Sequence, residues 1–333
     1  MKTRLTALQV TVLLLAFLKA PQLLAETNWH AITWDNDAFV GTDNGYTAGL
    51  YYTWFDTQDG NDPEIGFLAS SMRWSLAEHA KPIGSVSSKT IGQAMITPED
   101  ISLEDPPETD LPYAGLLYFN DTHISVYPGG FADLIGVTIG ITGEYSLAGD
   151  TQEFLHSIIG SEEPKGWDTQ IDDEIVFRFN RGRVWKGWTS GSGKQDILIS
   201  ADAAIGTISS YLGGSIIWRY GQGLSRSYAT VLLSNDRSAN PVAVSSGWHW
   251  FAGTGFRYTA NTIFLDGNTY TDSRKIEDWE HNQVPITIGF SYASRNWSFA
   301  YALNDLNVID NNDSDVVDEY SRYGTITFAW RAE

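Results

Sequence analysis

Residues 48–54 read AGLYYTW and residues 324–330 read GTITFAW, and these two stretches decide the fold class. In each, apolar or aromatic side chains alternate with small or polar ones. Period-two alternation puts successive side chains on opposite faces of a β-strand, so one face is apolar and the other is not. This pattern is typical of a membrane β-barrel, whose wall meets lipid outside and a polar interior inside.

The same alternation recurs along nearly the whole chain. We expect about twelve strands, each long enough for the roughly 9–11 residues that a tilted strand needs to cross a bilayer. The expected strands are residues 29–35, 46–56, 88–96, 113–127, 134–145, 171–184, 194–207, 211–222, 248–260, 284–294, 297–306 and 322–331. The predicted fold class is therefore all-β, a transmembrane antiparallel β-barrel. A soluble β-sandwich stays open as an alternative, although its strands are usually shorter.

The composition agrees with this fold class. The chain of 333 residues has no cysteine, 13 tryptophans, 16 tyrosines and a formal net charge of −20. Membrane barrels use such amphipathic rings as girdles at both interfaces. An acidic surface repels nucleic acid and suits divalent cations, so we expect no nucleic-acid partner. Because cysteine is absent, disulfides contribute nothing to stability.

Residues 1–25 have the features of a secretory signal peptide. Two basic residues precede an apolar run from Val10 to Leu18, and Ala25 offers a small residue for cleavage. The run is too short for a membrane-spanning helix. We therefore expect residues 1–25 to be removed and residues 26–333 to form the barrel.

The order of the strands locates the chemically unusual stretches. With the N-terminus in the periplasm, every odd connection lies outside the cell. The outer connections are then residues 36–45, 97–112, 146–170, 208–210, 261–283 and 307–321. A helical pattern over residues 63–81 falls on the inner side, between the second and third strands.

The third outer connection contains a predicted short helix, in residues 150–170, DTQEFLHSIIGSEEPKGWDTQ. Asp150 begins a capping-box pattern and Gly160 supplies a stop. Gln152 and His156 are four positions apart and share one face of this helix. From these residues alone, His156 is either a solvated loop histidine or a catalytic base.

The first outer connection is rich in oxygen ligands. Residues 34–49, WDNDAFVGTDNGYTAG, include five Asp and Asn side chains. A polar hairpin loop uses the same residue types. Carboxylate and amide oxygens can also hold Ca²⁺, although the spacing is not that of an EF-hand. Both readings stay open on the residues alone.

Taken together, these stretches resemble the outer-membrane lipid A 3′-O-deacylase family. The blocks that carry the resemblance are Asn36-Asp37, Thr42-Asp43, residues 46–49, Thr97-Pro98, residues 110–115, Ile135-Gly136, Gly140, Gln152, His156, Gly160, Glu162, Gly166-Trp167 and Gln170. The resemblance is strongest over residues 29–186 and rests on strand pattern beyond them. It implies a monomeric barrel in the outer membrane of a Gram-negative bacterium, with lipid A or lipopolysaccharide as its partner among the membrane lipids.

The resemblance also implies the reaction, which is Ca²⁺-dependent hydrolysis of the ester of the 3′-acyloxyacyl chain of lipid A. The matching site positions are Asn36, Asp37, Thr47, Gln152, His156 and Glu162. His156 would be the general base that activates water. Ca²⁺ near Asp37 and Asn36 would stabilise the oxyanion. Thr47 and Gln152 would orient the base or the substrate, and Glu162 would position the loop or fix the imidazole tautomer.

The second outer connection departs from the family pattern. Members of the family carry a lysine there that could meet a lipid A phosphate, whereas residues 98–108 are strongly acidic here. Lys165 could take over, bound cations could meet the phosphate, or the substrate could differ.

Two other functions stay open. The first is an outer-membrane phospholipase with a serine nucleophile, but Ser157 adjoins His156 and adjacent helix positions do not face each other. The second is a non-enzymatic pore, which needs an open lumen, whereas a barrel of about twelve strands with many aromatics should be filled by side chains. We expect the other histidines to be wall, linker or loop residues, and the acidic run 310–319 to be a solvated loop.

Overall fold

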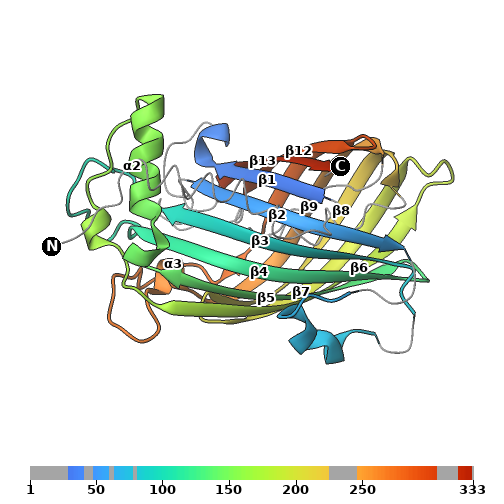
Figure 1. The fold of residues 1–333 in the computed structure, drawn as a ribbon, viewed down its shortest axis with the longest axis horizontal. Coiled ribbons are helices and arrows are strands. Elements are labelled where there is room, and N and C mark those ends of the chain that lie inside the picture. The colour runs from blue at the N-terminus through green and yellow to red at the C-terminus, as the bar shows by residue number, and fades with distance from the viewer. Residues whose placement is uncertain are drawn as a thin grey trace.

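The computed structural model describes residues 29–40, 48–59, 64–77, 81–224, 246–305 and 322–331. Consecutive strands are antiparallel neighbours, except that β10 and β11 both pair with β9. Because β1 also pairs with the last strand and β8 pairs with β9, the sheet closes on itself (Figure 1). The strands are β1 (Trp29–Asn36), β2 (Ala48–Asp59), β3 (Gly84–Ile96), β4 (Ala114–Tyr127), β5 (Phe131–Thr142), β6 (Ile175–Thr189), β7 (Gln195–Gly206), β8 (Ser209–Gln222), β9 (Gly247–Thr262), β10 (Asn282–Gln283), β11 (Ile286–Ala293), β12 (Trp297–Asp305) and β13 (Arg322–Arg331).

Two short strands share one position in the barrel. Both β10 and β11 pair with β9, at successive parts of its length. Pro285 lies between them and has no backbone N–H to donate, so the ladder is interrupted there. The barrel therefore has twelve strand positions, and the predicted all-β antiparallel barrel is confirmed.

Strand boundaries differ from the prediction by a few residues. The clearest case is β6, which begins at Ile175 rather than at residue 171. The amide of Ile171 donates to the Tyr113 carbonyl and the amide of Asp172 donates to the Asn268 side chain. These residues are bound to neighbouring loops instead of to a strand.

The pairing register shows which side chains point outward. In β1, Ile32 and Trp34 point outward and are 36% and 46% exposed, whereas Ala31 and Thr33 point inward and are buried. Exposed apolar side chains continue on the outward face from β6 to β13. They include Ile175, Phe177, Phe179, Ile199, Ile205, Leu212, Ile216, Trp218, Trp250, Phe256, Ile288 and Phe328. This apolar belt is the surface expected to meet lipid.

Inward side chains fill the barrel at two levels. Near the end where β1 begins, an apolar cluster includes Trp29, Phe55, Val86, Ile124, Leu134, Val184, Leu198 and Ile217, contributed by every strand from β1 to β8. At the opposite end, Tyr51 and Tyr118 join the buried helix α3 (Ile263–Asp266) and Trp279. The expected filling of the lumen is thus seen in the described residues.

The odd connections that the structure describes lie at one end of the barrel, which we call the outer end. They carry η2 (Asp37–Val40), η4 (Glu144–Ser146), α2 (Ala148–Ile159), η5 (Trp167–Thr169) and α3. Figure 1 shows α2 and α3 at this end, whereas η3 (Ala69–Ser75) lies outside the barrel, alongside its wall. Within the described residues, no helix is long and apolar enough to cross a membrane.

The helix predictions were correct in place but not in detail. Gly160 ends α2 in a left-handed conformation, as predicted. The capping box is wrong, because α2 begins at Ala148 after Leu147 (φ 60°), has no side-chain cap and contains Asp150 in its first turn. The helix expected over residues 63–81 is only the short η3. The predicted signal peptide, Thr47, His79 and the acidic run 310–319 lie outside the described residues.

Candidate active site

The floor of the candidate site is a row of outward-facing residues across four neighbouring strands. Asn36 of β1 pairs with Ala48 of β2, Ala48 with Met95 of β3, and Met95 with Gly115 of β4. Ala48 and Met95 are only 6% and 1% exposed although they point away from the lumen. Another part of the chain must therefore cover this face.

The start of α2 provides that cover. A Cβ added at Gly115 would overlap the Ser146 hydroxyl and the Ala148 methyl group, so only glycine allows this approach. Ser146 is held in place because its hydroxyl donates to the Gly143 carbonyl (2.6 Å) and its own carbonyl accepts from the Gln93 side chain (2.7 Å). These contacts explain why the helix begins at Ala148 and not after Asp150.

From this point α2 runs across the outer rim of the barrel (Figure 1). A helix rises about 1.5 Å per residue, so His156 lies roughly 12 Å along the axis from Ala148. The distance from β4 to β1 is three strand spacings, or about 14 Å. The helix that starts at β4 also contacts β3, and His156 lies one turn further along it than Gln152.

Gln152 is a buried side chain with a fixed orientation. The Trp167 indole N–H donates to its Oε1 at 2.7 Å, and the residue is 1% exposed. Trp167 itself packs on Tyr113, with ring centroids 5.0 Å apart, and on Gly149 of α2. Because Oε1 accepts the indole hydrogen, Nε2 is left as a buried donor with no partner within the described residues.

His156 has one ring nitrogen engaged by the backbone. Its Nδ1 lies 2.5 Å from the carbonyl oxygen of Glu162. A carbonyl oxygen can only accept, so Nδ1 carries the hydrogen and, in the neutral ring, Nε2 is an acceptor. The side chain of Glu162 is exposed, so its role at the ring is played by its backbone.

Neighbouring hydroxyl groups do not compete with His156 as nucleophile or base. The Ser157 hydroxyl donates to the Phe154 carbonyl at 2.7 Å, within the helix. Burial raises the pKa of Tyr113 to about 12, and its hydroxyl donates to the Ile101 carbonyl. Tyr113 therefore stays neutral at any working pH and serves as packing for Trp167.

Asn36 and Asp37 offer oxygen ligands at the rim, beside this floor. Asp37 begins η2 and is 2% exposed. Phe39 holds η2 against the barrel, through an edge contact with the Trp34 ring and close approach to Gly324. Oxygen donors alone suit a hard cation such as Ca²⁺. No group of three His, Cys, Asp or Glu side chains able to hold a metal occurs among the described residues.

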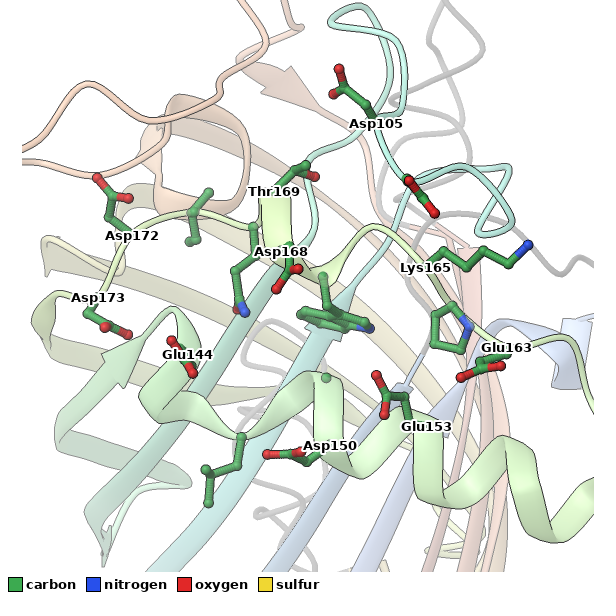
Figure 2. Close-up of a pocket in the computed structure, with 17 residues that line it drawn as sticks. Asp105, Glu144, Asp150, Glu153, Glu163, Lys165, Asp168, Thr169, Asp172 and Asp173 are labelled. Carbon is green, nitrogen blue, oxygen red and sulfur yellow. The ribbon is translucent and has the colours of Figure 1, made fainter. Parts of the chain in front are cut away.

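An acidic cavity of about 870 Å³ lies on another side of α2 (Figure 2). Asp150 and Glu153 enter it from α2, and Asp168, Asp172 and Asp173 from the segment that leads to β6. Lys165 is the one basic residue among those that line it. Gln152 and His156 do not line this cavity, although Trp167, which binds Gln152, does. Lys165 thus has predominantly acidic neighbours, which weakens its attraction for a phosphate.

Sequence reasoning placed Asn36, Gln152 and His156 at one end of the barrel, and the structure has all three at the outer end, with α2 packed on β3 and β4. Thr47, the remaining expected residue, directly precedes Ala48 but lies outside the described residues. Trp167 and Gly115 were part of the family pattern without an assigned role. The other described histidines are wall or loop residues, as predicted: His30 bonds to Tyr52, His123 to Ser87 and Ser125, His281 to the Thr259 carbonyl, and His249 is buried inside the barrel.

A family model described as outer membrane protein LpxR matches residues 8–332. The chain belongs to the LpxR family. Membership places the protein in the outer membrane of a Gram-negative bacterium and supports an action on lipid A.

Solved structures agree with the LpxR fold. LpxR from Salmonella typhimurium is 17% identical with a TM-score of 0.69, over 91% of this chain and 99% of that one. The β domain of the Bordetella autotransporter BrkA (TM-score 0.46, 8% identity, 92% and 98% coverage) and outer membrane phospholipase A from Escherichia coli (0.31, 9%, 92% and 90%) are more distant. No curated protein sequence matches the chain.

Proposed function

We propose that this LpxR family member is a Ca²⁺-dependent lipid A 3′-O-deacylase, which hydrolyses the ester of the 3′-acyloxyacyl chain. The observation that carries the proposal is the state of His156. Its Nδ1–H is committed to a backbone carbonyl, so Nε2 remains as a base at the outer end of the barrel. The family resemblance and the hydrogen bond of the imidazole ring therefore both favour His156 as the general base.

In the proposed reaction, Nε2 of His156 takes a proton from a water molecule as the water oxygen attacks the ester carbonyl carbon. The carbonyl electron pair moves onto the carbonyl oxygen. When this intermediate collapses, the bond to the 3′-oxygen of the sugar breaks and that oxygen receives the proton from His156. The products are the acyloxyacyl acid and lipid A with a free 3′-hydroxyl.

Donors on α2 and β1 would bind the negative oxygen. Nε2 of Gln152 is buried, oriented by Trp167 and available, which suits a preorganised donor. The Asn36 amide would be a second polar contact from the floor. Asp37 and Asn36 would hold Ca²⁺, which when bound supplies positive charge next to the oxyanion. Thr47 is assigned an orienting role by the family resemblance alone.

The position of the floor suits a lipid substrate. The row from Asn36 to Gly115 lies on the outward face of the barrel near the outer end. An ester of lipid A lies near the outer-leaflet interface, so it would reach this face from the membrane without entering the lumen. Because the second outer loop is acidic, a lipid A phosphate would be met by bound cations or by Lys165, or the substrate would differ.

The alternative functions find less support. Ser157 bonds to a helix carbonyl and not to His156, which disfavours a serine-nucleophile phospholipase. Apolar side chains from eight consecutive strands meet inside the barrel, which disfavours a pore.

Purified protein in detergent, incubated with lipid A and Ca²⁺, tests the proposal. We expect mass spectrometry to show two products, the free acyloxyacyl acid and lipid A lighter by that group at the 3′ position. Release of fatty acid from phospholipid, with lipid A intact, would instead indicate a phospholipase. Unchanged lipids together with stable conductance in planar bilayers would indicate a pore.

A further inference from the structure

The outward face of β4 to β6 carries charged side chains where a membrane barrel should be apolar. Asp121 lies on β4, Asp133 on β5, and Arg181 and Arg183 on β6. On β6 the same outward face has Phe179 before these arginines and Trp185 after them, 36% and 40% exposed. The charged patch therefore lies within the depth of the apolar belt, where unshielded charge is unfavourable.

The charges in this patch compensate one another. Asp133 accepts from the Arg183 guanidinium at 2.5 and 2.9 Å and lies 2.9 Å from Arg181. Asp133 is fully buried although it points away from the lumen. This network needs a cover that supplies polar partners, which hydrocarbon chains cannot do.

Residues 64–77, which include η3, form that cover by folding back along the outside of the barrel. Asp121 accepts the amides of Leu68 and Ala69 at 2.9 and 3.2 Å, and Asp133 accepts the amide of Ala77 at 3.1 Å. At the end of η3, Arg181 donates to the Ser75 carbonyl. The backbone of this segment therefore replaces lipid over the charged patch.

The opposite side of the cover exposes two large aromatic side chains, with Glu64, Ser70, Ser71 and Arg73 exposed beside them. The side chains of Phe67 and Trp74 are 88% and 76% exposed. Its hydroxyl groups are satisfied within the segment: those of Ser70, Ser71 and Ser75 donate to the carbonyls three residues earlier, at 2.6 to 2.8 Å. Such back-bonding is how serine is accommodated on helices in lipid.

We propose that residues 64–77 are embedded in the inner leaflet of the outer membrane, with Phe67 and Trp74 inserted among phospholipid acyl chains. The segment is continuous with the lipid-facing wall on β6, since exposed Phe179 and Trp185 flank the patch that it covers. It thus covers the charges on one side and presents two large aromatic side chains on the other.

The absence of cysteine allows a direct test with single-cysteine variants. Phe67→Cys and Trp74→Cys would be labelled with an environment-sensitive fluorophore in nanodiscs of phosphatidylcholine and phosphatidylglycerol. Ile199→Cys, on the exposed wall of β7, is the lipid-facing control. Ser192→Cys, in the exposed turn between β6 and β7 at the same end as η3, is the aqueous control. Heat-modifiable electrophoretic mobility shows that each variant is folded.

We expect labels at positions 67 and 74 to behave as at Ile199→Cys: blue-shifted emission, quenching by acyl-chain spin labels and loss of quenching by iodide. Iodide quenching as at Ser192→Cys would overturn the proposal, because the segment would then lie in water. Protection from both quenchers would overturn it equally, since it would indicate a protein partner or a second copy. Both side chains are exposed, so neither substitution removes internal packing.

Discussion

Nδ1 of His156 donates to the carbonyl oxygen of Glu162, at 2.5 Å. The contact is made by the peptide group of Glu162, and its carboxylate is exposed. The same turn is closed by the amides of Gly160 and Ser161, which both donate to the His156 carbonyl. The loop after α2 thus fixes the imidazole by backbone geometry.

This relationship predicts that Glu162→Ala retains most of the wild-type rate of lipid A deacylation, because the carbonyl that orients the ring remains. Loss of a residue acting through its carboxylate in acid–base catalysis would instead lower the rate by roughly 10²- to 10⁴-fold. Initial rates of acid release from lipid A measure the difference. Glu163→Ala, at the next exposed carboxylate, is the matched control.

Trp167→Phe tests the orientation of Gln152. Phenylalanine keeps an aromatic ring against Tyr113 but removes the N–H that binds Gln152. A hydrogen bond contributes about 1 kcal/mol, so we expect kcat to fall on the order of 5-fold. Trp188→Phe, on the outward face of β6, should leave kcat unchanged. If Trp167→Phe also retains full kcat, the amide of Gln152 does not need this bond for its role.

Gly115→Ala tests the seating of α2 on the floor. The added methyl group would overlap Ser146 and Ala148, so the start of the helix must move away from β4. We expect loss of deacylation with an intact heat-modifiable barrel. Gly191→Ala, where a Cβ meets nothing within 4 Å, is the control and should keep full activity. An active Gly115→Ala variant would show that the site tolerates displacement of α2.

Metal removal tests the role of Asp37. We expect EDTA to abolish deacylation and added Ca²⁺ to restore it. Asp37→Ala should lower both the rate and Ca²⁺ binding measured by titration calorimetry, because it removes a carboxylate ligand at the rim. Asp168→Ala, in the acidic cavity that Gln152 and His156 do not line, should change neither. Full activity in EDTA would contradict a calcium-dependent reaction.

The strands were predictable because their pattern is set by two environments that alternate along the chain. Lipid meets Ile32 and Trp34, and the interior meets Ala31 and Thr33, so the sequence records each face directly. Because connections alternate between the two ends of a barrel, counting the strands then sufficed to predict that Asn36 and His156 lie at the same end.

Other features depended on tertiary contacts that leave no periodic signal. The start of α2 is decided by the fit of Ala148 over Gly115, which overrides the capping pattern at Asp150. The length of the helix in residues 63–81 was overestimated because the amides of Leu68 and Ala77, on either side of η3, bind Asp121 and Asp133 of the wall. The backbone role of Glu162 could not be read from its side chain.

The most direct test is mass spectrometry of lipid A from cells that express the wild type, His156→Ala or Ser157→Ala. The account predicts loss of the 3′-acyloxyacyl mass with the wild type and Ser157→Ala, and unmodified lipid A with a folded His156→Ala barrel. Losing the base should lower the rate by roughly 10²- to 10⁴-fold. Unmodified lipid A with the wild type, or deacylation by His156→Ala but not by Ser157→Ala, would contradict it.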